Sequence, residues 1–222
     1  MKTIILNETG GVDKLQLTDT QKPQIKSNEV LVKVKAISIN PVDVNARAYD
    51  HVLNWIYGDI RPVTLGWDMA GEVSEIGEEV TGFKVGDRVF GMVNFFGNGK
   101  AYAEYTAAPA SHLALIPEHY TFEEAAAATL AAVTAYQALV DVAKIKKNDR
   151  VLIHAASGGV GHFAVQIANI LELTYWELPL QIIRNLFCRL GRMSILIIPK
   201  NTVWILQEIS ILLSIPFREK HC

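Results

Sequence analysis

The stretch that most constrains the fold is residues 150–168, RVLIHAASGGVGHFAVQIA. Its first apolar run, Val151, Leu152 and Ile153, is typical of a buried parallel strand. A glycine-rich turn follows, and then come apolar residues at helical spacing, namely Phe163, Val165, Ile167 and Ala168. The order of strand, glycine turn and helix predicts a βα unit of an α/β sheet.

The turn differs from G-x-G-x-x-G only by alanine in the first glycine position. A dinucleotide pyrophosphate needs such a turn, because glycine lets the backbone approach the phosphates and the helix N-terminus offers N–H groups. The alternative is a glycine turn that binds no ligand. On the first interpretation the cofactor-binding residues are Ala156, Ser157, Gly158, Gly159, Val160 and Gly161.

Composition excludes several other classes of function. The 222 residues carry a net charge of −2, which gives no electrostatic reason to expect a nucleic acid or an anionic membrane as partner. The first residues read as a strand and not as a signal peptide, and no run reaches about 18 apolar residues. Cys188 and Cys222 show no ligand spacing. We therefore expect a cytoplasmic protein.

The first 120 residues predict a β-rich domain. Residues 30–37 alternate apolar and basic side chains, as a strand with one solvated face does. Residues 69–76 and 102–107 are further strands, the latter ended by Pro109. Short strands with regular turn signals favour a compact β-barrel-like domain.

The pattern changes at Thr121. Thr121 and Glu124 form a predicted capping box, which is followed by an alanine-rich helix over residues 125–140. We thus expect a β-barrel-type domain over 1–120 and the start of a nucleotide-binding domain over 121–171, which is an α/β plus β fold class.

Several separate motifs now resemble one family, in its order and spacing: residues 40–43, 66–73, 85–89, 134–139 and 156–161. The chain resembles the zinc-independent, quinone oxidoreductase-like medium-chain dehydrogenases/reductases over about residues 1–171. The resemblance implies a GroES-like barrel domain, a Rossmann domain and NADPH in the cleft between them, with NADH not excluded. It also implies a homodimer for the full-length family.

The residues around the expected cleft give no zinc site. Zinc needs thiolate and imidazole ligands, yet residues 1–171 contain no cysteine. Where the zinc branch has Gly-His-Glu, this chain has Gly66, Trp67 and Asp68. We therefore expect no metal, and chemistry that depends on hydride transfer from the cofactor to a quinone or an α,β-unsaturated carbonyl.

The resemblance also implies candidate catalytic residues, namely Asn40, Asp43 and Tyr49, with Tyr49 as a proton donor. It places Thr134 at the nicotinamide side of the cofactor. Each has an ordinary alternative, because Asn-Pro is a turn signal, Asp43 can cap a helix, Tyr49 can be a core residue and the Thr134 hydroxyl can bond to its own helix.

Residues 172–222 differ from the rest of the chain. They contain no alanine, no aspartate and one glycine, Gly191. Back-translation with a shifted frame gives strings similar to the family's later strands, among them G-T-A-S after Trp176. We interpret this tail as the product of a frameshift, which would leave the edge of the strand at 151–153 open unless the apolar runs at 195–198 and 209–215 cover it.

Two functions remain open from the sequence. The first is an NADPH-dependent oxidoreductase that reduces quinones or enones without zinc. The second is a truncated and catalytically silent fragment of such a reductase, at most a weak nucleotide- or protein-binding module.

Overall fold

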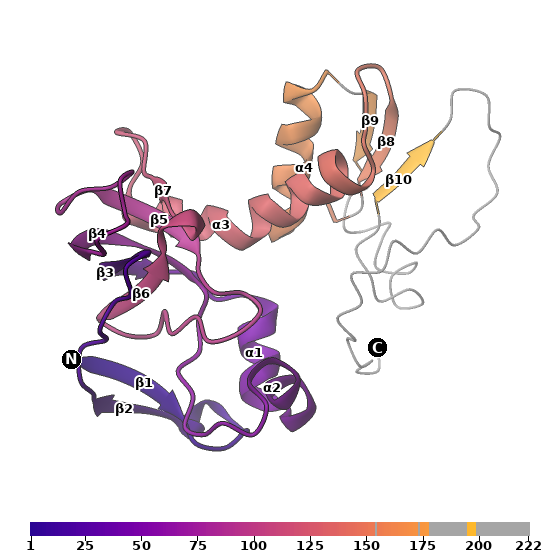
Figure 1. The fold of residues 1–222 in the computed structure, drawn as a ribbon. Helices are drawn as coiled ribbons and strands as arrows, with labels where there is room; N and C mark the ends of the chain where they lie inside the picture. Colours follow the sequence, from indigo (N-terminus) through magenta and orange to yellow (C-terminus); the bar gives the residue numbers. More distant parts are fainter. Residues whose placement is uncertain (154, 173, 178–194, 199–222) are drawn as a thin grey trace. The chain divides into compact units, whose positions relative to one another are not determined.

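The computed structural model describes residues 1–153, 155–172, 174–177 and 195–198 (Figure 1). The chain divides into two compact units, Met1–Leu130 and Ala131–Cys222. Most of the predicted anomalous tail lies outside the described residues, and the predicted domain limits stay a prediction.

The first unit is built on a five-stranded antiparallel sheet in the order β6-β3-β4-β5-β7. The first 20 residues form a separate two-stranded antiparallel sheet of β1 and β2. The strands are β1 (Lys2–Leu6), β2 (Leu15–Asp19), β3 (Glu29–Ile37), β4 (Asp68–Ile76), β5 (Arg88–Met92), β6 (Tyr105–Pro109) and β7 (Ala114–Leu115). The predicted strands at 30–37 and 69–76 are confirmed as β3 and β4.

The prediction for residues 102–107 is wrong at both ends. The strand β6 begins only at Tyr105, because the Tyr102 N–H donates to the carbonyl oxygen of Leu65 instead of joining the sheet. It also includes Pro109, which pairs with Glu29. β6 pairs only with β3, and a proline, which lacks an N–H, is tolerated in such an edge strand.

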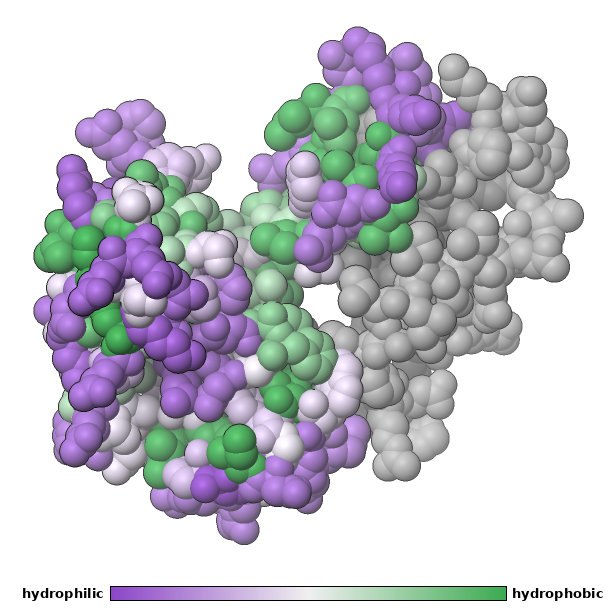
Figure 2. Space-filling model, in the orientation of Figure 1, coloured by the Kyte–Doolittle hydropathy of each residue, from purple (hydrophilic) through white to green (hydrophobic). Residues whose placement is uncertain are grey.

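Short helices connect the strands of the first unit. They are η1 (Val12–Lys14), α1 (Pro41–Ala48), α2 (Asp50–Tyr57) and η2 (Ala110–His112). The helices α1 and α2 bury Val42, Ala46 and Leu53 in one hydrophobic cluster with the indole of Trp67. On the face seen in Figure 2, hydrophobic residues of this unit form separate patches among hydrophilic ones.

The alanine-rich segment forms α3 (Phe122–Tyr136), which continues as a π-helical stretch, η3 (Gln137–Val142). The predicted capping box is confirmed: the Thr121 N–H donates to Glu124 Oε2 at 2.9 Å, and the Glu124 N–H donates to Thr121 Oγ1 at 3.2 Å. By length and composition alone, residues 122–142 are the one described segment that could cross a membrane. Their buried side chains nevertheless pack into hydrophobic clusters, as those of a core helix do.

The second unit contains the predicted βα unit, β8 (Arg150–Ile153) followed by α4 (Gly159–Ile170). Two further strands flank β8. β9 (Thr174–Glu177) pairs with it in parallel, and β10 (Ile195–Ile198) pairs with it antiparallel. The edge of β8 is not open in this structure: the apolar run at 195–198 covers one side as β10, which was the expected alternative, and β9 pairs with the other side, while the run at 209–215 lies outside the described residues.

Gly71 on β4 is a position where the sheet has no room for a side chain. A methyl group there would overlap the carbonyl oxygen of Lys33 on the neighbouring strand. We expect Gly71→Ala to lower the free energy of unfolding by about 2 kcal/mol, measured by urea denaturation. Gly82→Ala is the matched control, because no atom lies within 4 Å of its added methyl group. Equal stability of the two variants would contradict this account of the sheet.

Candidate functional site

Asn40 and Asp43 lie together at the start of α1. Asn40 is the N-cap residue, Pro41 occupies the first helical position, and the Asn40 N–H donates to Asp43 Oδ2 at 2.8 Å. This local sequence folds as it does because asparagine and proline favour those two positions. Asn40 is 9% exposed and Asp43 is 2% exposed, so both side chains are shielded from water.

Asp68, the first residue of β4, completes this group. Its Oδ2 accepts hydrogen bonds from Asn40 Nδ2 at 2.9 Å and from the Leu130 N–H at 3.2 Å, and the residue is fully buried. We call Asn40, Asp43 and Asp68 the buried amide–carboxyl cluster. Within the described part of the chain, the Oδ1 atoms of Asp43 and Asp68 have no partner with good hydrogen-bond geometry, although the side chains of Tyr102 and Thr129 lie close enough to lower the pKa of Asp43 and Asp68 respectively.

Burial controls the electrostatics of the cluster. Loss of solvation, together with the neighbouring charge of Asp68, raises the pKa of Asp43 to about 6, although the Asn40 N–H opposes the rise. Loss of solvation also raises the pKa of Asp68. Burial and the charge of Asp43 raise the pKa of the Tyr57 and Tyr102 hydroxyls. The site therefore holds two carboxyl groups that bind protons more tightly than surface carboxyl groups do.

Trp67, which stands in place of the zinc branch's histidine, has a structural role. Its indole is fully buried and donates from Nε1 to the carbonyl oxygen of Gly97 at 2.7 Å. The ring also packs edge-to-face on Phe95, with centroids 5.4 Å apart. These contacts fix the aromatic loop at residues 95–99, whose exposed Phe96 packs against Trp55. In the described residues no group of three or more histidine, cysteine or acidic side chains is placed to hold a metal ion.

Two other predicted site residues lie outside the cluster. Tyr49 lies at the junction of α1 and α2 and is 47% exposed, so it is not a core residue. Its ring contacts that of His51 at a tilt of 37°, with the ring centroids 5.7 Å apart. Thr134 is half-buried on α3. The structure thus brings Asn40 and Asp43 together, while the roles of Tyr49 and Thr134 stay predictions.

The predicted cofactor-binding turn has the shape that a pyrophosphate requires. Gly158 is the N-cap of α4, and its N–H donates to the carbonyl oxygen of Ala155 at 2.8 Å. A methyl group on Gly161 would overlap that carbonyl oxygen, so this glycine allows the helix to approach the turn closely. Among the described residues, apart from its chain neighbours and the backbone of its own helix, no atom lies within 4 Å of a methyl group built on Gly159, which leaves the helix N-terminus open on that side. These features fit a bound phosphate group.

Sequence reasoning missed Asp68 as a site residue. The sequence did contain a sign of this role, because β4 begins with an acidic residue that is followed by apolar ones, and a charge is costly to bury there. From the sequence, Asp68 was considered only in connection with the absence of zinc ligands. Its place beside Asn40, 28 positions earlier in the chain, follows from the fold and could not be obtained from spacing.

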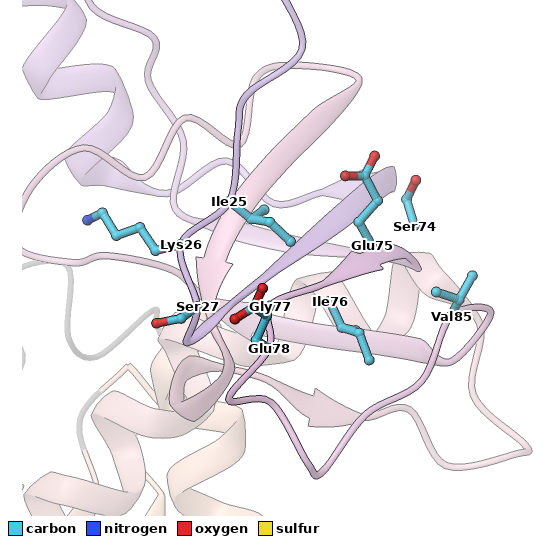
Figure 3. Close-up of a pocket in the computed structure, with 9 residues that line it drawn as sticks. All are labelled: Ile25, Lys26, Ser27, Ser74, Glu75, Ile76, Gly77, Glu78 and Val85. Carbon is cyan, nitrogen blue, oxygen red and sulfur yellow. The ribbon is translucent and has the colours of Figure 1, made fainter.

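One surface groove of the first unit lies apart from the amide–carboxyl cluster. It has a volume of about 720 Å³ and lies where β4 ends (Figure 3). We do not assign it as the site, because neither the cluster nor the glycine turn contributes to its lining, which consists of Ile25, Lys26, Ser27, Ser74, Glu75, Ile76, Gly77, Glu78 and Val85.

Comparison with known proteins confirms the expected resemblance and fold class. Residues 26–118 match the alcohol dehydrogenase GroES-like domain. The chain is 40% identical over 174 residues to the quinone oxidoreductase of Sus scrofa, an alignment that covers 78% of this chain and 51% of that protein. The chain therefore spans about half the length of this relative.

Two of the solved structures that are similar to this chain are quinone oxidoreductases of bacteria. The quinone oxidoreductase of Coxiella burnetii has a TM-score of 0.73 and 35% identity, covering 86% of this chain and 60% of that one. The Escherichia coli quinone oxidoreductase complexed with NADPH has a TM-score of 0.68 and 32% identity, covering 80% and 52%.

The buried carboxyl of Asp43 predicts a pH-dependent stability. The folded state binds its proton more tightly than the unfolded chain does, so this group stabilises the fold at acid pH, and that contribution is lost as pH rises through about 6. Asp43→Asn keeps an acceptor for the Asn40 N–H. We expect its free energy of unfolding near pH 4 to be about the same as that of wild type. Near pH 7 it should be more stable than wild type by about 2 kcal/mol.

Urea denaturation across this pH range measures the difference. Asp19→Asn is the control of opposite sign: its carboxyl is exposed and its pKa is lowered by Lys2, so its replacement should not stabilise the fold near pH 7. A difference between Asp43→Asn and wild type that does not change with pH would contradict the assignment.

Proposed function

Since this chain carries an alcohol dehydrogenase GroES-like domain and is homologous to the quinone oxidoreductases, we propose that it is an NADPH-dependent oxidoreductase. Its proposed substrates are quinones or α,β-unsaturated carbonyls, and its proposed reaction is a hydride transfer that needs no zinc. The observation that carries the proposal is the glycine turn at the start of α4, which is open at Gly159 and closely packed at Gly161.

The proposed cofactor site is the helix N-terminus at residues 158–161. The first N–H groups of a helix have no partner within it, and its positive dipole end favours an anion. The pyrophosphate of NADPH fits this position, and the solved Escherichia coli quinone oxidoreductase is a complex with NADPH. NADPH, when bound, supplies the hydride, and the chain orients it.

The proposed work of the chain at the substrate falls to Asn40. Hydride addition to a conjugated carbonyl places negative charge on the carbonyl oxygen, which a fixed N–H donor stabilises. Asn40 Nδ2 carries two protons, of which one bonds to Asp68, so the second remains to meet such an oxygen. The low exposure of Asn40 strengthens this electrostatic interaction, because little water competes with it.

Gly159 gives the sharpest test of the cofactor site. We expect Gly159→Val to weaken NADPH binding by about a hundredfold, or about 3 kcal/mol, since the side chain would fill the space that the pyrophosphate needs. The fold should persist, because in the described part of the chain no atom outside its own helix and chain neighbours lies within 4 Å of the added carbon. Calorimetric titration measures the affinity, with Gly82→Val as the matched control. Unchanged affinity in Gly159→Val would show that the turn is not the site.

Asn40 gives the corresponding test at the substrate. We expect Asn40→Ala to lower kcat by about 10²-fold, the usual effect of removing one oxyanion donor, while the Kd for NADPH changes little. Steady-state assays with a quinone and with an enone measure this, and the exposed Asn98→Ala is the control. A loss of NADPH affinity with unaltered kcat would contradict the proposed role.

A further inference from the structure

Two different carboxyl groups hold Asn40, one at its backbone N–H and one at its side-chain amide. Asp43, one turn along the same helix, accepts the Asn40 backbone N–H at 2.8 Å. Asp68, from β4, accepts the side-chain Nδ2 at 2.9 Å. The first contact fixes the backbone at the helix start, and the second fixes the side chain. A proposed functional residue with both ends held is preorganised.

The contact with Asp68 also decides which end of the amide faces which way. A side-chain amide has a donor end and an acceptor end, whereas an ionised carboxyl group only accepts. Asp68 therefore orients the Asn40 NH₂ group toward itself and leaves Oδ1 on the other side. A neutral apolar residue at position 68 would remove the acceptor that holds the Asn40 Nδ2 atom.

Asp68 itself is rigidly placed. Its Oδ2 also accepts the Leu130 N–H at 3.2 Å, and its backbone carbonyl accepts the Ser38 N–H at 3.2 Å. As the first residue of β4 it pairs with Met92, and it is fully buried. Burying a carboxyl group costs stability unless its hydrogen bonds compensate. By strict geometry the Asp68 Oδ1 atom has no partner in the described residues, although the Thr129 side chain lies close enough to oppose the rise in the pKa of Asp68.

We propose that Asp68 is a positioning residue that holds the Asn40 amide in the orientation needed to donate to the substrate's developing oxyanion. This inference rests on the proposed function of Asn40. Asp68 acts through Asn40, and it has no separate role toward the substrate.

The kinetic test compares Asp68→Asn with Asp68→Leu. Asparagine keeps an acceptor oxygen for Asn40, while leucine has the same branching, a larger volume and no acceptor. We expect Asp68→Leu to lower kcat by about 10- to 100-fold with an unchanged Kd for NADPH, and Asp68→Asn to stay within about threefold of wild type. In the Asn40→Ala background, Asp68→Leu should cause no further loss of kcat, because the group that it positions is gone. An equal loss in both backgrounds would overturn the proposal.

A second measurement keeps the proposal testable if the chain shows no turnover, which would defeat the proposed function alone. The side-chain amide protons of Asn40 are identified by NMR as the signals that disappear in Asn40→Ala. In the wild-type chain they should exchange with water at least about tenfold more slowly than those of the exposed Asn98, as hydrogen-bonded and buried protons do. Exchange as fast as that of Asn98 would overturn the positioning role, and this comparison does not require any Asp68 variant to fold.

Discussion

The buried carboxyl group of Asp68 connects three elements, because its Oδ2 atom accepts hydrogen bonds from both Asn40 and Leu130. It ties the N-terminus of α1 to the start of β4, and through the Leu130 N–H the same carboxyl oxygen reaches α3. The neighbouring indole of Trp67 fills the hydrophobic cluster beneath α1 and α2 and fixes the aromatic loop by its bond to Gly97. Of the residues that stand where the zinc branch has histidine and glutamate, Trp67 packs in the core, and Asp68 is proposed to orient Asn40.

The two halves of the proposed chemistry depend on different physical devices. The glycine turn depends on two missing side chains: Gly159 leaves space at the helix N-terminus, and Gly161 lets α4 approach the turn closely. The amide–carboxyl cluster works by burial, which strengthens its hydrogen bonds and raises the carboxyl pKa values. Homology to quinone oxidoreductases gives both devices one interpretation, although the chain spans about half the length of the Sus scrofa protein.

The sequence predicted those features that depend on local chemistry. The capping box at Thr121, the strands β3 and β4, and the order of β8, glycine turn and α4 all follow from neighbouring residues. Features that depend on distant partners were missed. Tyr102 bonds to Leu65, which delays the start of β6, and Asp68 meets Asn40 only in the folded unit. The pairing of β9 with β8 was likewise missed, whereas the run at 195–198, which forms β10, had been named as a segment that could cover this edge.

The most direct test of the central claim follows deuterium from NADPH labelled at the transferred position into an enone acceptor, with mass spectrometry of the product. The account predicts one deuterium per product molecule, on the carbon β to the carbonyl group, with turnover in the presence of chelator. A chain that binds NADPH but yields no deuterated product would contradict the proposed reductase and would instead support a catalytically silent nucleotide-binding fragment.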